Sequence, residues 1–131
     1  MPKRRIHTEQ APQPVGPYSQ AVEVDGWIYV AGQVPIDPAT GTWITGDIAR
    51  QTDRVLRNIE AILTAAGATL RDVVKTTVFV ADLREFAALN EVYGRFFPEE
   101  CPPARATIEA KNLPGGCQVE IEAVARLRAG G

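Results

Sequence analysis

The sequence predicts an α+β fold in which a mixed β-sheet carries two helices on one face. Segments rich in β-branched and aromatic residues lie near both ends of the chain, and two stretches with helical periodicity lie between them. The resulting order of elements is βββαβαββ. With 131 residues, 45% of them apolar and 23% charged, the chain has the size and composition of one globular domain, and we expect residues 1–131 to form it.

The first strands are the clearest local prediction. Residues 4–8 suit a short edge strand, and the proline-rich residues 11–17 suit an ordered loop. Residues 21–30 consist of two β-rich runs on either side of Asp25 and Gly26, a pair that favours a type I′ turn. These runs predict a β-hairpin.

The first helix is predicted from a long apolar stripe over residues 48–63, after a turn-rich stretch at residues 35–46. Asp47 or Thr45 can cap its start, and Gly67 can end it.

The second helix is predicted from the spacing of Asp82 and Glu85, which is that of a capping box. One apolar stripe follows, made up of Phe86, Leu89, Tyr93 and Phe96 or Phe97. We expect this helix to run to about Phe97.

The remaining strands are expected at residues 73–80, 105–110 and 119–127. The run at residues 73–80 is broken only by Lys75, which predicts a strand covered on both faces, with Val73 on the face of Lys75 and Val74 on the other. In the last strand the odd-numbered residues are apolar, whereas Glu120, Glu122, Val124 and Arg126 share the opposite face.

Two helices can cover only one face of such a sheet. The other face, apolar in the middle and charged toward the last strand, must meet solvent or another subunit. The alternation therefore predicts an oligomer.

Several classes of function lose support from composition. A net charge of −2 argues against a nucleic-acid binder, and no apolar run is long enough to cross a membrane or to act as a signal peptide, so we expect a cytoplasmic protein. Cys101 and Cys117 are expected to be free thiols, with no metal site. Ser19 and His7 are the only residues of their types, which argues against a Ser-His-Asp triad.

The remaining chemistry must come from Arg, Glu, Tyr and Asn side chains and from backbone groups. Arg105 follows the stiff pair Pro102 and Pro103, so its guanidinium could be held ready for a carboxylate. Spacing alone fits a surface or interface salt bridge better. Glu120 and Glu122 could bind or polarise a water molecule, although spacing alone again favours solvated carboxylates.

Short segments spread over nearly the whole chain point to a family. They are residues 16–21 (GPYSQA), 31–35 (AGQVP), 74–80 (VKTTVFV), 103–105 (PAR) and 119–123 (VEIEA). Taken together and in this order, they resemble the signatures of the RidA/YjgF family, also called the perchloric-acid-soluble or endoribonuclease L-PSP family. The resemblance implies a chorismate-mutase-like fold assembled as a homotrimer, whose sheets form a central barrel with the helices outside.

The resemblance also implies an activity, which is the hydrolysis of 2-iminopropanoate or 2-iminobutanoate to the 2-keto acid and ammonia. No cofactor, nucleic acid or membrane is implied as a partner. Arg105 matches the arginine that binds the substrate carboxylate, and Glu120 matches the glutamate that holds the attacking water. Tyr18 and Asn90 match residues that orient the substrate in clefts between subunits.

Two positions of the implied substrate site depart from the family pattern. Ala31, beside Gly32, replaces a serine, and Thr107 replaces a cysteine. Three alternatives therefore stay open. They are a deaminase for a larger enamine such as aminomuconate, an endoribonuclease or translation inhibitor, and a non-catalytic carboxylate-binding or chaperone-like protein.

Overall fold

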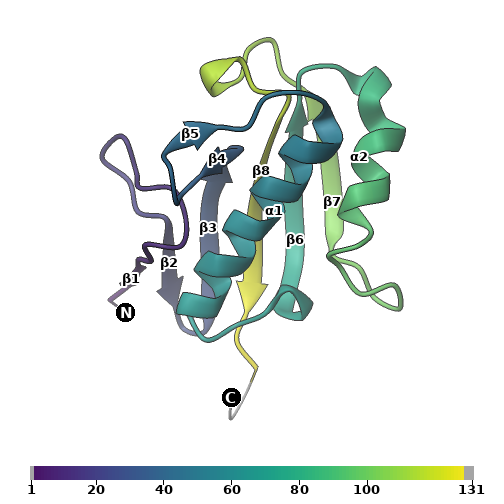
Figure 1. Ribbon diagram of the computed structural model, residues 1–131. Helices are drawn as coiled ribbons and strands as arrows, with labels where there is room; N and C mark the ends of the chain where they lie inside the picture. Colours follow the sequence, from purple (N-terminus) through teal and green to yellow (C-terminus); the bar gives the residue numbers. More distant parts are fainter. Residues whose placement is uncertain (1, 129–131) are drawn as a thin grey trace.

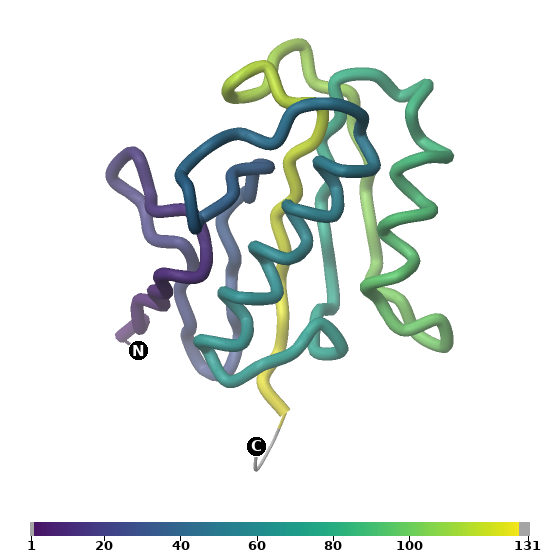
Figure 2. The backbone as a smooth tube through the Cα atoms, in the orientation of Figure 1, coloured from purple at the N-terminus to yellow at the C-terminus, as the bar shows by residue number. Residues whose placement is uncertain are grey.

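The structure is a computed structural model that describes residues 2–128. A six-stranded sheet in the order β1-β2-β3-β8-β6-β7 forms one layer, and two helices cover one of its faces (Figures 1 and 2). The strands of this sheet are β1 (Arg4–Ile6), β2 (Ala21–Val24), β3 (Trp27–Gln33), β6 (Val73–Val80), β7 (Ala104–Glu109) and β8 (Val119–Arg126). The helices are α1 (Ile48–Ala65) and α2 (Phe86–Tyr93). Strands β6 and β7 pair in parallel, and the other neighbours pair antiparallel.

The predicted hairpin is confirmed as β2 and β3. Asp25 and Gly26 form its turn with φ angles of 52° and 82°, the left-handed conformation that a type I′ turn requires. A second, small hairpin of β4 (Ile36–Asp37) and β5 (Thr42–Trp43) lies in the segment where we expected only turns.

Helix α1 begins and ends where the sequence indicates. The carboxylate of Asp47 accepts a hydrogen bond from the backbone N–H of Arg50 at 3.0 Å, and Gly67 follows the helix with φ of 87°. The apolar stripe of α1 is buried against the sheet and includes Val55, Leu56, Ile59, Ile62 and Leu63.

Helix α2 is shorter than predicted, because it ends at Tyr93 rather than near Phe97. Gly94 follows at once, and hydrogen bonds from Arg95 to Val92 and from Phe96 to Tyr93 tighten the chain into turns before Pro98. Phe97 is nevertheless buried.

The predicted capping box before α2 does not form. Asp82 instead accepts a hydrogen bond from the backbone N–H of Arg84 and forms an ion pair with its guanidinium, at the start of a short 3₁₀ turn at Leu83–Glu85.

The predicted faces of Val73 and Val74 in β6 are wrong. Val73 pairs with Ala125 and Lys75 pairs with Val124, so Val74 is an extra residue that interrupts the alternation. As a result Val73 is buried and Val74 is 43% exposed. Within one chain the helices cover one face of β6, and the opposite face lies open.

Among residues 2–128, no helix is both long enough and apolar enough to cross a membrane. Cys101 is exposed, Cys117 is buried, and both are free thiols, as predicted.

Candidate functional site

Arg105 lies on the edge strand β7 and points to the side of the sheet that carries the helices. Its register partner in β6 is Thr76, which is fully buried on that side. The guanidinium carbon of Arg105 lies 4.8 Å from the ring centroid of Tyr93 and 5.2 Å from that of Phe86, both on α2. No carboxylate within residues 2–128 forms an ion pair with Arg105. The guanidinium is therefore held by aromatic faces, and its N–H edges stay available to a ligand.

Two further predicted site residues share this side of the molecule. Thr107 lies two positions after Arg105 on β7 and pairs with Val78. Asn90 lies on the α2 face between Phe86 and Tyr93, because residues three and four apart are neighbours on a helix. Its Oδ1 atom is buried and has no hydrogen-bond partner within the described residues. We call Arg105, Thr107 and Asn90 the arginine cluster.

Glu120 lies on β8, on the open face of the sheet. Its register partner is Phe79 of β6, and its side chain is half-buried. Burial, and to a lesser extent the nearby Glu122, raises the pKa of the Glu120 carboxyl above its ordinary value. An ionised carboxylate here is poorly solvated, so it is a stronger base than an exposed glutamate.

Gly32 of β3 lies against Glu120, and Ala31 precedes Gly32 in the same strand; we call these three residues the glutamate cluster. The register of β3 and β8 shifts between Val30 and Gln33, so β3 carries an extra residue there. A β-carbon at position 32 would overlap the Oε2 atom of Glu120. Glycine is therefore needed to let the carboxylate lie against the backbone of β3.

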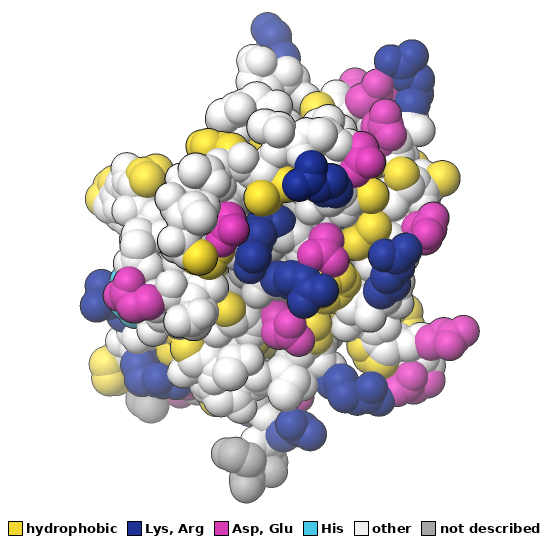
Figure 3. Space-filling view, in the orientation of Figure 1, with side chains coloured by type: hydrophobic (Ala, Val, Ile, Leu, Met, Phe, Trp, Pro, Cys, Tyr) yellow, Lys and Arg dark blue, Asp and Glu magenta, His cyan; other side chains and the backbone are white. Residues whose placement is uncertain are grey.

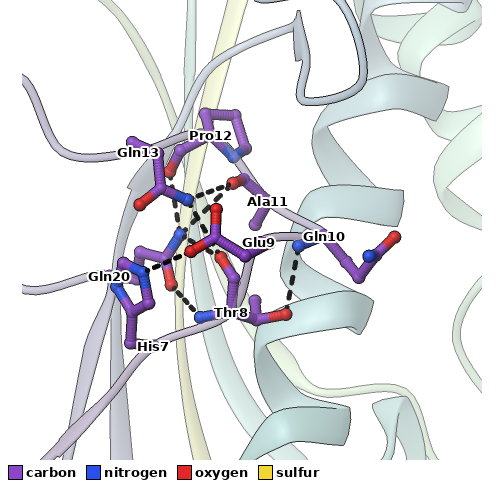
Figure 4. A network of polar contacts seen from close by, with 8 residues as sticks. All are labelled: His7, Thr8, Glu9, Gln10, Ala11, Pro12, Gln13 and Gln20. Carbon is purple, nitrogen blue, oxygen red and sulfur yellow. Dashed lines mark hydrogen bonds and ion pairs between the residues drawn. The ribbon is translucent and has the colours of Figure 1, made fainter.

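Gln20, which was not predicted as a site residue, anchors the loop before β2 (Figure 4). It also binds the backbone of Ala31. Its backbone carbonyl accepts a hydrogen bond from the N–H of Ala31 at 2.9 Å. Its buried side-chain amide donates to the backbone carbonyls of Thr8, Ala11 and Pro12. The proline-rich loop could have pointed to Gln20 in the sequence, because the backbone carbonyls of such a loop need a hydrogen-bond donor from a side chain.

Tyr18 lies in the same loop and is 52% exposed. Its hydroxyl accepts a weak hydrogen bond from the N–H of Val15 at 3.4 Å. In the part of the chain that the structure describes, no hydrogen bond links Tyr18 to either cluster.

A single chain does not bring Arg105 and Glu120 together. Strand β6 lies between β7 and β8, and the two side chains point to opposite faces of the sheet. A site that uses both side chains must therefore take them from two copies of the chain. Residues 2–128 also contain no group of three or more His, Cys, Asp or Glu side chains that could hold a metal ion.

The sheet order and the two helices on one face define the chain as an α+β protein with a chorismate-mutase-like fold. A family model described as Endoribonuclease L-PSP matches residues 8–127, and the chain belongs to this family, which includes the proteins named RutC and Rid.

Individual relatives are similar to this chain over nearly their full lengths. A RutC family protein of Pyrococcus abyssi is 54% identical over 95% of this chain and 98% of its own. The solved structure of YyfA from Yersinia pestis, of the conserved Rid protein family, is 43% identical with a TM-score of 0.93 and covers 96% of this chain and 100% of its own. The structure of E. coli TdcF with bound serine is 39% identical with a TM-score of 0.90, covering 95% and 99%.

Proposed function

We propose that the protein hydrolyses 2-imino acids of the 2-iminopropanoate and 2-iminobutanoate type to 2-keto acids and ammonia. The observation that carries the proposal is the guanidinium of Arg105, which is held by two aromatic rings and has no carboxylate partner within residues 2–128. The ligand of the related TdcF structure supports it, because serine, like an imino acid, carries a carboxylate next to a carbon that bears nitrogen.

The substrate carboxylate binds the two parallel N–H edges of Arg105, which fixes the adjacent imine carbon in space. Glu120 holds a water molecule and takes its proton as the water oxygen bonds to that carbon. The C=N double bond becomes single, and its electron pair accepts the proton from Glu120. Glu120 then transfers the hydroxyl proton to the amino nitrogen as the C–N bond breaks, so that a C=O group forms and ammonia leaves. Water is the only co-reactant, and no cofactor takes part.

The proposed site lies between subunits of a homotrimer. Each subunit supplies its arginine cluster to one cleft and its glutamate cluster to another, because the two clusters lie on opposite faces of the sheet. The open sheet faces meet at the centre of the trimer, and Tyr18 and Asn90 orient the substrate in the cleft. The family resemblance and the open face of the sheet support this assembly.

The substrate preference depends on Ala31 and Thr107. Ala31 next to Gly32 offers no hydroxyl and leaves more room than a serine would, which favours imino acids with longer side chains. A comparison of 2-iminopropanoate with larger enamines tests this part of the proposal.

Binding of RNA is not favoured by the surface that carries the helices. On this face Lys and Arg side chains alternate with Asp and Glu side chains and form no continuous basic stripe (Figure 3). Such a stripe is the usual means of binding a phosphate backbone.

The proposal is tested by generating the imine with a threonine dehydratase and following keto-acid release with and without this protein. The parent should accelerate release. Arg105→Ala should abolish the acceleration, because a small imino acid offers little else to bind. Glu120→Gln should lower kcat by about 10²–10⁴ and leave KM within a small factor, as expected for a lost proton acceptor.

Arg84→Ala is the matched control, because Arg84 is another surface arginine with a side chain that is 91% exposed. It should retain the parent activity. No acceleration by the parent, or full acceleration by Arg105→Ala, would contradict the proposed function.

A further inference from the structure

We propose that Tyr93 is a positioning residue, which sets the plane of the Arg105 guanidinium and leaves its N–H edges free for a carboxylate. This inference rests on the proposed function and deepens it, because it names what prepares the arginine for its ligand. A set of contacts that link β6, β7 and α2 to one another supports it.

The ring of Tyr93 is fixed at its far end. The Tyr93 hydroxyl lies 2.7 Å from Oγ1 of Thr76, and both residues are buried. Thr76 is also the register partner of Arg105. One strand pairing therefore fixes both the backbone of Arg105 and the hydroxyl that holds the ring beneath its guanidinium.

The ring of Tyr93 remains a neutral aromatic surface at physiological pH. Burial raises the pKa of the Tyr93 hydroxyl, although the hydrogen bond with Thr76 and the charge of Arg105 act in the opposite direction. A neutral ring attracts a guanidinium through its face.

An aromatic ring leaves the N–H edges of Arg105 free for a ligand, whereas an acidic partner would not. A carboxylate would bind the N–H edges of Arg105 and occupy the place of the substrate, whereas a ring occupies only a face. Phe86 lies near the same guanidinium, 5.2 Å from its ring centroid, but it is 42% exposed and no hydrogen bond can hold its ring. Of the two rings, that of Tyr93 is therefore the one held in a fixed position.

The central test is Tyr93→Leu, which keeps an apolar side chain but removes the ring. A desolvated cation–π contact corresponds to roughly tenfold in affinity, so the dissociation constant of a keto acid such as 2-oxobutanoate should rise about tenfold. KM for the imine should rise by a similar factor with kcat within about twofold, because the carboxylate is held equally in the ground state and the transition state. Tyr93→Phe keeps the ring but loses its hydrogen bond to Thr76, so its dissociation constant should lie between those of the parent and of Tyr93→Leu.

Phe97→Leu is the matched control. Phe97 is buried and its ring lies 4.6 Å from that of Tyr93, so the change perturbs the same part of the core without removing a ring from Arg105. It should leave keto-acid affinity unchanged. If Phe97→Leu weakens binding as much as Tyr93→Leu does, the role of Tyr93 is only structural and the proposal is wrong.

A second measurement separates this proposal from the proposed function. ¹⁵N relaxation of the Nε–H group of Arg105 should report an ordered guanidinium in the parent and a mobile one in Tyr93→Leu, whether or not the protein hydrolyses imines. Equal order in the two proteins would overturn the positioning role. An inactive parent that shows the change in order would contradict only the proposed function.

Discussion

Among individual side chains, Glu120, the proposed base, shows most directly how packing changes the proton affinity of a carboxyl group. Its carboxyl lies against Gly32, where a β-carbon would overlap it, and burial raises its pKa with a smaller effect from Glu122. The same burial that makes Glu120 a better base makes its ionised form unfavourable for folding. Activity and stability therefore place opposite demands on this position.

Glu120→Gln should raise the free energy of unfolding at neutral pH while it lowers turnover. The pKa of Glu120 is higher in the folded protein than in the unfolded chain. At pH values just above the ordinary pKa of 4.5, the folded state therefore binds more protons than the unfolded state does. Stability of the parent should therefore fall across that pH range, and the fall should be smaller in Glu120→Gln. Thermal unfolding of both proteins from pH 4 to 8, at one protein concentration, provides the measurement. Parallel curves for the two proteins would contradict it.

Sequence reasoning predicted Arg105 and Glu120 as site residues, but it could not supply their surroundings. Phe86 and Tyr93 were predicted as core residues of one helical stripe, and Tyr93 is indeed buried. Their contact with Arg105 depends on the register between β6 and β7, which pairs Thr76 with Arg105. Such a pairing between distant segments leaves no mark in local periodicity.

At the scale of elements, α1 does more than cover the sheet, because its polar groups hold the chain segments on either side of the glutamate cluster. Asn58 is fully buried, and its amide donates to the backbone carbonyls of Val34 and Ile36, just after β3. Gln51 accepts a hydrogen bond from the backbone N–H of Gln118, just before β8. Helix α1 thereby fixes the strand ends next to Gly32 and Glu120.

Asn58→Ala should lower the free energy of unfolding by about 2 kcal/mol, because it removes two hydrogen bonds to partly buried carbonyls, each contributing about 1 kcal/mol. Asp47→Ala, which removes only an exposed helix cap, should lower it by about 1 kcal/mol. Urea unfolding of both variants and the parent at one protein concentration compares them. Equal losses would show that the hydrogen bonds of Asn58 add nothing beyond helix stability.

The elements themselves were largely predictable, and their irregularities were not. The turn at Asp25 and Gly26 and the cap at Asp47 depend on neighbouring residues, so local chemistry was sufficient to predict them. The extra residue at Val74 and the early end of α2 at Tyr93 depend on partners that are distant in the chain or on a balance between competing turns. A β-bulge reverses the faces of the residues beyond it, which is why Val73 and Val74 were exchanged in the prediction.

For the whole molecule, the main consequence of the topology is that the two clusters cannot meet within one chain. Aromatic and aliphatic side chains on the open sheet face, including Tyr29 at 48% and Ile108 at 46% exposure, favour a contact between subunits there. In the proposed trimer, a ring of identical contacts lets the arginine cluster of each subunit meet the glutamate cluster of the next. Light scattering should then report a trimer mass.

Mixed trimers test this arrangement directly. Alone, Arg105→Ala should be inactive and Glu120→Gln should keep only its low residual rate. Equal amounts refolded together should regain about a quarter of the parent activity. Each site needs one chain with an intact Arg105 and one with an intact Glu120, and each is present with a probability of about one half. The measurement is the dehydratase-coupled rate of the refolded mixture, compared with each variant refolded alone and with the two variants mixed without unfolding. A rate no higher than the sum of the separate variants would mean that subunits do not share the site. Because the structure keeps Arg105 and Glu120 on opposite faces of one chain, that result would exclude a mechanism that uses both residues.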